Sequence, residues 1–253
     1  MNDTPEKTSL FHKQKGLKLV THCSVQQRYG QMVLQEYLAY KFYNEMTDHS
    51  LRVRLAEIEY FDTIRGKSII TRKAFFIEDT DDAAKRNGIK EIDIKDIQKA
   101  QLDPVAAGRL AVFHYLISNY DWSMHNSTKT ALCCHNTKLI GSREEPLAGL
   151  IPVPYDFDHS GLVDSPYAAL PPALRLRAIT DRRYRGFCLH NNEAVQAIES
   201  MKPLQPVYKA MVANVPGLTN LTKSKINKFT KKFFADIKDP ATAQKKLLDD
   251  CRD

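Results

Sequence analysis

Two acidic motifs in the middle of the chain decide our interpretation: Asn119-Tyr120-Asp121-Trp122-Ser123-Met124-His125-Asn126 and Pro154-Tyr155-Asp156-Phe157-Asp158-His159-Ser160-Gly161. The first places Asp121 five residues before Asn126, and the second sets Asp156 and Asp158 on either side of a phenylalanine. Two carboxylates that meet in a cleft repel each other, so without a cation one is forced toward protonation. Carboxylate and amide oxygens are the ligands that Mg²⁺ prefers. Together the motifs predict a magnesium site.

The elements around these motifs are readable from the sequence. Asp103 followed by Pro104 predicts a helix start, with an N-cap residue and proline at the first helical position. This helix runs to the first motif. Residues 135–140 and 147–155 have the character of two strands of a hairpin turned by GSREEP, and the second strand leads directly into Asp156.

The residues before and after this central part complete the expected order. Upstream we expect a strand over residues 17–22, a helix over 26–47, strands over 52–61 and 69–77, and a charged linker with one surface helix over 79–99. Downstream the chain reads as helices near 194–200, 204–212 and 222–237. This order predicts an α+β fold with a small N-lobe over residues 1–99 and a mainly helical C-lobe over 100–253.

The composition is that of an ordinary globular protein with an excess of positive charge. The 253 residues are 43% hydrophobic and 26% charged, as in an ordinary globular protein, and carry a formal net charge of +7. The excess of positive charge suits an anionic partner, but the interpretation we favour is that the lysines of the C-terminal third solvate helices. Residues 223–238 are basic on one side and apolar on the other, which favours packing on the C-lobe over nucleic-acid binding.

The cysteines and the N-terminus bear on the compartment. The five cysteines form no CxxC pair, which argues against zinc, and their odd count with adjacent Cys133 and Cys134 argues against a full disulfide framework. No apolar run reaches the length of a membrane span, and the first residues lack the apolar core of a signal peptide. We therefore expect a cytoplasmic protein, or an exported or periplasmic one if the true start lies upstream.

Several stretches, read in order, resemble a known family. They are KLVTHC (18–23), LQEYLAYKFYN (34–44), AFFIED (74–79), NYDWS (119–123), the His-Asn dipeptides, IPVPYDFDHSGLV (151–163) and YRGFC (184–188). This set resembles the atypical kinase-like families, and among them most closely the spore-coat kinase (CotH) group and its bacterial relatives. The resemblance extends from Leu17 to Cys188, about three-quarters of the chain.

The resemblance implies a protein-kinase-like two-lobed fold with a reduced N-lobe that binds ATP and Mg²⁺. It implies that Lys18 contacts the α- and β-phosphates, that Glu36 is the ion-pair partner of Lys18, and that Glu78 lies at the hinge near the adenine. Asp121 would be the catalytic aspartate, which takes the proton of a hydroxyl acceptor.

The metal ligands implied by the resemblance are Asp156, with Asp158 as a second ligand or an orienting residue, and one asparagine. Asn126 has the kinase offset of five from Asp121, whereas Asn136 directly precedes a hydrophobic strand, as the kinase asparagine does. Spacing slightly favours Asn126, and both remain candidates.

One departure from the kinase pattern keeps other functions open. A kinase covers the phosphates with a glycine-rich hairpin before the lysine strand, but here only Gly16 precedes Lys18. The expected function is Mg-dependent transfer of a nucleotide phosphoryl group to a hydroxyl acceptor. The alternatives are a catalytically impaired pseudokinase or nucleotide-binding module, and a basic nucleic-acid-binding protein.

Overall fold

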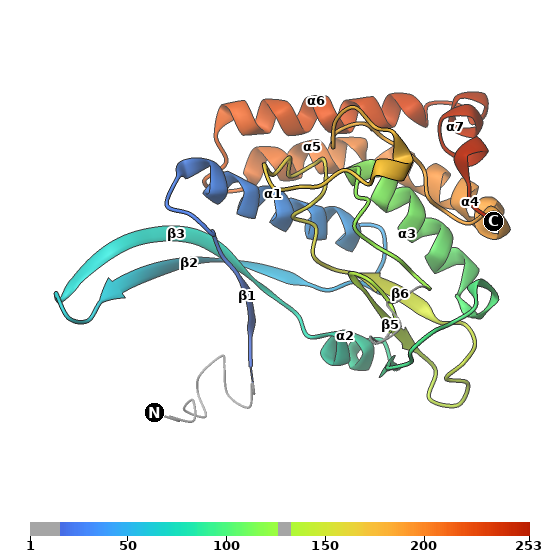
Figure 1. The fold of residues 1–253 in the computed structure, drawn as a ribbon, viewed down its shortest axis with the longest axis horizontal. Coiled ribbons are helices and arrows are strands. Elements are labelled where there is room, and N and C mark those ends of the chain that lie inside the picture. Colours follow the sequence, from blue (N-terminus) through green and yellow to red (C-terminus); the bar gives the residue numbers. More distant parts are fainter. Residues whose placement is uncertain (1–15, 126–132) are drawn as a thin grey trace.

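The computed structural model describes residues 16–125 and 133–253, and it confirms the α+β class. Two small antiparallel sheets lie beside a layer of helices (Figure 1). The 3-10 helices are short: η1 Lys99–Gln101, η2 Pro172–Leu174, η3 Cys188–His190, η4 Lys202–Leu204 and η5 Leu248–Asp250.

The first sheet has the strand order β1-β3-β2. Its strands are β1 Lys18–Val20, β2 Val53–Asp62 and β3 Lys67–Ile77, and β1 is shorter than the sequence predicts. The β2–β3 hairpin extends away from the body of the protein (Figure 1). Helix α1 Gln27–Asn44 packs on β3, with Leu34, Leu38 and Phe42 fully buried. This contact places Glu36 next to the interior.

The second sheet has the order β4-β5-β6, with β4 Lys90–Ile92, β5 Thr137–Gly141 and β6 Ile151–Pro154. The predicted hairpin is therefore confirmed as β5 and β6, with Thr137 opposite Pro154. The prediction of a linker over 79–99 is correct for its surface helix, α2 Thr80–Arg86, but wrong for β4. Pairing with β5 makes residues 90–92 a strand, which the short charged sequence does not reveal.

Helix α3 Pro104–Ile117 begins as predicted, since the Asp103 side chain accepts a hydrogen bond from the Ala106 N–H at 2.7 Å. Apolar residues on nearly all of its sides are buried, as expected of a helix inside a core. The helix ends at Ser118, whose φ of 53° is in the left-handed region. This reversal turns the chain into the loop that carries Asp121.

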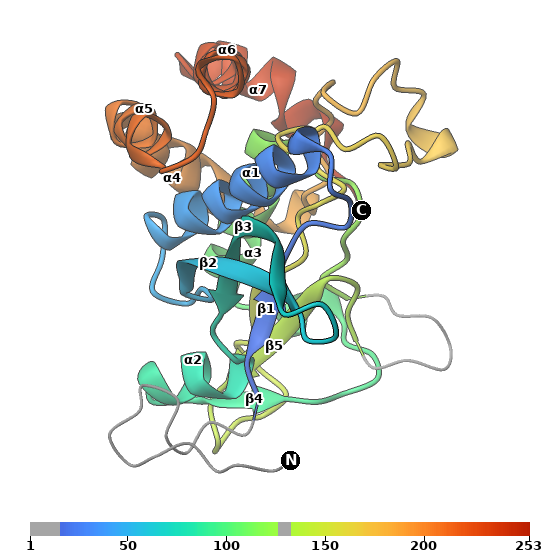
Figure 2. The same ribbon diagram turned by 90° about the vertical axis from the view of Figure 1, so that its left-hand side faces the viewer.

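The C-terminal third is helical, as predicted, and adds one helix that the sequence analysis missed. The helices are α4 Asn191–Met201, α5 Gln205–Asn214, α6 Asn220–Asp236 and α7 Pro240–Lys246. Helix α7 begins with an N-cap residue, Asp239, whose side chain accepts a hydrogen bond from the Thr242 N–H at 2.8 Å. Pro240 follows at the first helical position. Figures 1 and 2 show α5 and α6 lying beside α1 on the side opposite the sheets.

One hydrophobic cluster links the whole described chain. It includes Leu34 and Phe75 from the N-terminal part together with Phe113, Tyr208 and Phe233. The core is therefore continuous across the expected boundary between residues 99 and 100, and that division into lobes stays a prediction. Among the described residues, no helix combines the length and apolar character that a membrane span requires.

The cysteines form two disulfides, Cys188–Cys251 and Cys133–Cys134, and Cys23 is free. The sequence argument against a full disulfide framework did not anticipate either bond. Cys188 and Cys251 are 63 residues apart in sequence, and their pairing depends on how the C-terminal segment packs. The Arg252 N–H donates to Gly186 O at 2.8 Å, and the Cys188 N–H donates to Arg252 O at 2.9 Å.

We expect reduction to destabilise the protein. Loss of a cross-link that closes a loop of 63 residues should cost about 4 kcal/mol by the chain-entropy relation, or roughly 10 °C in Tm for a chain of this size. Calorimetry with and without reductant measures this change. The Cys188→Ser/Cys251→Ser variant is the control, since reductant should then shift its Tm little. Equal wild-type Tm values in both conditions would contradict the prediction.

Candidate functional site

The loop after α3 holds Asp121 in a fixed backbone conformation. The Asp121 N–H donates to Asn119 Oδ1 at 3.0 Å, and the Trp122 Nε1–H donates to Asn119 O at 2.9 Å. The Trp122 ring is buried and stacks on His114 of α3, with 4.2 Å between ring centroids. The single tryptophan therefore anchors the loop, while the Asp121 side chain stays 40% exposed.

Two side chains from the strand β5 region hold the Asp121 carboxylate. His135 Nε2 lies 2.6 Å from Asp121 Oδ1, and Asn136 Nδ2 donates to Asp121 Oδ2 at 3.0 Å and to Asp121 O at 2.9 Å. An antiparallel β-bridge between Ser123 and His135 brings the Asp121 loop next to the segment before β5. Of the two candidate asparagines, Asn136 is thus in contact with Asp121, and Asn126 lies outside the described residues.

Side chains of helix α1 hold the Asp156-Phe157 segment by accepting hydrogen bonds from its backbone N–H groups. The Asp156 N–H donates to Tyr40 Oη at 2.9 Å, and the Phe157 N–H donates to the Glu36 carboxylate. The Phe157 ring is fully buried, 4.5 Å from Tyr40 and 5.4 Å from Phe113 between ring centroids. The phenylalanine between the two aspartates is therefore a core residue that fixes where they lie.

The carboxylates of the second motif face each other and Glu36. Burial, together with the charges of Asp156 and Asp158, raises the pKa of Glu36 to about 8. Burial also raises the pKa of Asp156 to about 6, together with the charge of Asp158 and a hydrogen bond to its side chain, and with the charge of Asp121. The fold thus brings together Glu36, Asp121, Asp156 and Asp158, four of the residues singled out in the sequence.

Three of these four residues border a small cavity of about 210 Å³, and Asp121 does not line it. Glu36, Asp156 and Asp158 line it together with Tyr167, whose side chain is hydrogen-bonded to Asp158. Asp156 itself has a φ of 62°, and Asn136 has a φ of 47°. Left-handed backbone at non-glycine residues costs free energy and concentrates at functional sites, so both positions support the interpretation of this region as a site.

The donor set fits a hydrated magnesium ion. Among the described residues, no three His, Cys, Asp or Glu side chains converge as a complete protein cage. Mg²⁺ seldom uses such a cage, because it keeps several waters and takes one or two carboxylates plus phosphate oxygens. Asp156 and Asp158 supply that number of carboxylates. Burial and then the neighbouring negative charge raise the pKa of Asp156, and a cation would neutralise that charge.

Lys18 is not paired with Glu36, so this expectation needs correction. Lys18 Nζ lies 3.2 Å from Asp79 Oδ2, and both side chains are about half exposed. The cause is the register of the sheet, which sets Lys18 opposite Ile77, close to Asp79 and the end of β3. Glu36 instead accepts the backbone hydrogen bond described above.

Hydrogen bonds from two arginines occupy the carboxylate of Glu78. Arg86 Nε and Nη2 donate to its two carboxylate oxygens at 3.0 and 2.9 Å, and the Arg52 N–H donates to it at 2.9 Å. Glu78 and Lys18 both border a separate cavity of about 370 Å³, which includes neither Glu36 nor Asp156. The structure therefore divides the expected nucleotide-contacting residues between two places.

Sequence reasoning missed three residues that support the site. Tyr40 follows Glu36 by one helical turn, and that i, i+4 spacing was the available signal. For His135, the available signal was its position directly before Asn136. Arg185, in the YRGFC stretch, donates to Tyr120 O at 2.6 Å and so supports the Asp121 loop, which no local pattern indicates.

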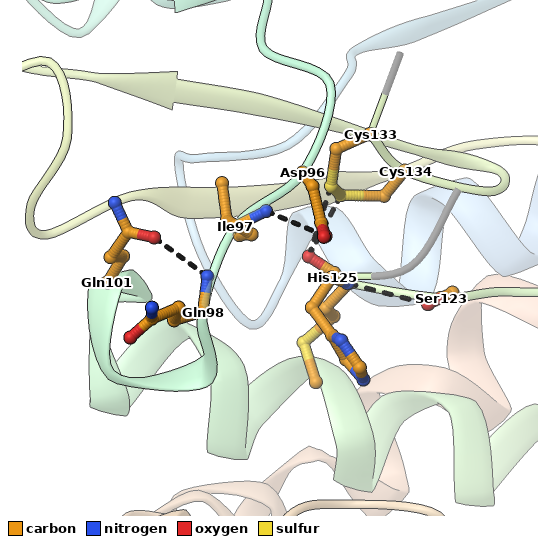
Figure 3. The surroundings of a disulfide bond; sticks show 9 residues. Asp96, Ile97, Gln98, Gln101, Ser123, His125, Cys133 and Cys134 are labelled. Atoms are coloured by element: carbon orange, nitrogen blue, oxygen red, sulfur yellow. Dashed lines mark hydrogen bonds between the residues drawn. A yellow bond between two sulfur atoms is a disulfide. The ribbon is translucent and has the colours of Figure 1, made fainter. Parts of the chain in front are cut away.

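The Cys133–Cys134 disulfide lies near the end of the Asp121 loop. Figure 3 shows the pair beside Ser123 and His125. The Cys134 Sγ is 2.8 Å from Met124 O, and the Cys133 N–H donates to Ile94 O at 2.8 Å. These contacts connect the segment before β5 with the loop that carries Asp121.

Comparisons with known proteins add no name to this geometry. Neither the protein-family models nor the curated proteins contain a match to this chain. The candidate site therefore depends on its own residues and contacts.

The raised pKa values of Glu36 and Asp156 predict the pH dependence of stability without added metal. A carboxyl whose folded-state pKa is raised contributes stability at low pH, which is lost as pH rises through the folded value. For Asp156 and Glu36 this window runs from about pH 4 to about pH 8. Glu36→Gln keeps the acceptor for the Phe157 N–H but cannot ionise, so we expect it to be more stable than wild type above pH 8.

Urea unfolding at pH 5 and pH 8.5 measures this difference, which should reach several kcal/mol at the higher pH because each pKa unit corresponds to about 1.4 kcal/mol. Glu45→Gln, at the exposed end of α1, is the matched control and should not change the pH dependence. A Glu36→Gln variant less stable than wild type at pH 8.5 would show that the ionised carboxylate is required.

The environment of Glu78 predicts a loss of stability. Glu78→Gln leaves the guanidinium of Arg86, which is only 20% exposed, without its carboxylate partner, and should cost about 2 kcal/mol. Thermal unfolding measures the loss, and Glu199→Gln, in an exposed pair with Lys202, should be nearly neutral. An unchanged Tm together with weakened nucleotide binding would instead support the nucleotide contact implied by the family resemblance.

Proposed function

We propose that the protein is a Mg-dependent phosphotransferase that moves a phosphoryl group from ATP to a hydroxyl acceptor, with a reduced kinase-like arrangement. The observation that carries this proposal is the meeting of Asp121 and Asp156, 35 residues apart in sequence, with Asn136 hydrogen-bonded to Asp121. Phosphoryl transfer relies mainly on positioning and charge neutralisation, for which such a set of polar groups is suited.

Each residue has a distinct role in this proposal. Asp121, held by His135 and Asn136, orients the acceptor hydroxyl and takes its proton. Asp156 and Asp158 hold the magnesium ion, with the Asn136 amide oxygen as a further donor. The ion, when bound, neutralises phosphate charge. Glu36 and Tyr40 position the Asp156-Phe157 backbone and do not contact the reacting atoms.

The pairing of Lys18 with Asp79 favours one alternative function. Among the described residues, no lysine forms an ion pair with Glu36, so the phosphates would lack the cation that a kinase normally supplies there. A module that binds Mg-ATP and transfers the phosphoryl group slowly or not at all fits this arrangement. Turnover, rather than binding, distinguishes the two functions.

The disulfides bear on where this activity would take place. Such bonds persist mainly in oxidising compartments. With two of them in the described residues, we propose the exported or periplasmic alternative over the cytoplasmic one.

Calorimetry of ATP binding with and without Mg²⁺ tests the metal site. We expect wild type to bind ATP only with Mg²⁺, and Asp156→Asn to lose this binding because it removes a metal-binding charge. Asp249→Asn, at an exposed position, is the control and should bind normally. Absence of binding in wild type would overturn the phosphotransferase proposal.

Release of phosphate from labelled ATP then tests catalysis. Asp121→Asn should bind Mg-ATP like wild type but lose about 100-fold in turnover, the lower range for removal of a general base. Equal turnover in Asp121→Asn and wild type would exclude Asp121 as the base. Wild-type binding without turnover would identify the nucleotide-binding module.

A further inference from the structure

A larger cavity adjoins the carboxylates, and the proposed phosphotransfer does not use it. It has a volume of about 640 Å³ and lies between α1, α6 and the segment that follows the second acidic motif. Met32 and Val163 line both this cavity and the smaller one that contains Asp156 and Asp158, so the two are neighbours. The N-terminal ends of α1 and α6 lie on the same side of the molecule (left in Figure 1).

The walls of this cavity carry unbalanced positive charge. Lys225, Lys228 and Lys232 come from α6, and Arg28 comes from α1, against one carboxylate, Asp164. The three lysines are spaced i, i+3 and i+7 and so share one helix face. Within the part of the chain that the structure describes, none of the four cations has a carboxylate within ion-pair distance.

Apolar side chains also line this cavity, beside its polar and charged ones. They are Met32 of α1, Val163 of the segment after the second motif, and Ile226 and Phe229 of α6. Leu221, at the start of α6, also borders the cavity and is 69% exposed. A ligand that matches this surface must combine negative charge with apolar groups, which distinguishes it from a simple polyanion.

We propose that this cavity binds an acidic peptide segment with at least one apolar residue, and that this segment presents the hydroxyl acceptor to Asp121. Seven residues of helix span about 10 Å from Lys225 to Lys232, a length that about three residues of an extended peptide cover. The volume also suits a few side chains. The proposed peptide binding is argued from the cavity alone. The proposed role of the peptide as acceptor depends on the phosphotransferase function proposed above.

Fluorescence anisotropy with two labelled peptides tests the binding. The probe has alternating glutamate and leucine around one serine, and its partner has lysine in place of each glutamate. We expect wild type to bind the acidic peptide at least about tenfold more tightly at physiological ionic strength, since charge complementarity sets the preference. Equal affinity for both peptides, or none for either, would overturn the proposal.

Charge reversal in the cavity tests the location. The triple substitution Lys225→Glu, Lys228→Glu and Lys232→Glu should weaken binding of the acidic peptide at least about tenfold. The control is Lys231→Glu, Lys245→Glu and Lys246→Glu, which changes the net charge equally at exposed residues outside the cavity. Equal losses in both variants would show attraction by net charge alone and overturn the site.

Helix propensity is similar for glutamate and lysine, so both variants should fold. Circular dichroism checks this, and a triple Lys→Gln variant at the same positions replaces the cavity variant if it does not fold. A single-stranded DNA oligonucleotide is added as competitor. If it binds wild type more tightly than the acidic peptide does, and loses affinity in the cavity variant, the cavity is a nucleic-acid site and the peptide proposal is wrong.

Mg-ATP binding to the same variants separates this inference from the proposed function. We expect the cavity variant to bind Mg-ATP as wild type does, and to lose phosphoryl transfer to the acidic peptide. Wild type that binds Mg-ATP but not the peptide overturns the docking site and leaves the phosphotransferase intact. Wild type that binds the peptide but not Mg-ATP overturns the phosphotransferase and the acceptor role.

Discussion

Helix α1 determines where the second acidic motif lies, through two hydrogen bonds one helical turn apart. Tyr40 accepts the backbone N–H of Asp156, and Glu36 accepts that of Phe157. The buried Phe157 ring then packs between α1 and α3 and joins the motif to the helix that leads into Asp121. Because both helices contact one phenylalanine, the two aspartates are positioned by the same core. The distance between Asp121 and Asp156 therefore depends on core packing as well as on the loop contacts that hold Asp121.

This arrangement places the buried carboxyl of Glu36 next to Asp156, which is exposed, and Asp158, which is partly exposed. Glu36 is almost fully buried, and the neighbouring aspartates oppose its ionisation. Buried charge without a partner is costly, so without a bound cation Glu36 keeps its proton up to a pH of about 8. The left-handed backbone of Asn136 and Asp156 adds a further cost. Interactions that reduce stability in this way are typical of sites that gain their compensation from a ligand.

Much of the local structure was predictable, because it depends on short-range chemistry. The Asp103-Pro104 start of α3, the β5–β6 hairpin and the C-terminal helices follow from capping and periodicity. The meeting of Asp121 with Asp156 was also anticipated, from motif order. The pairing of Lys18 was not, since it depends on the register of β1 against β3, and no local pattern specifies that register. Strand β4 is similar: three residues become a strand only because β5 offers them an edge.

The Cys188–Cys251 bond also divides the chain into parts that respond differently to mechanical force. Helices α4 to α7 lie inside the covalent ring that this bond closes, whereas α1 and both sheets lie outside it. The cavity of about 640 Å³ is lined by α6, which lies inside this ring, and by α1, which lies outside it. Under tension between residues on either side of the ring, about 200 Å of extended chain would remain hidden until the sulfurs separate.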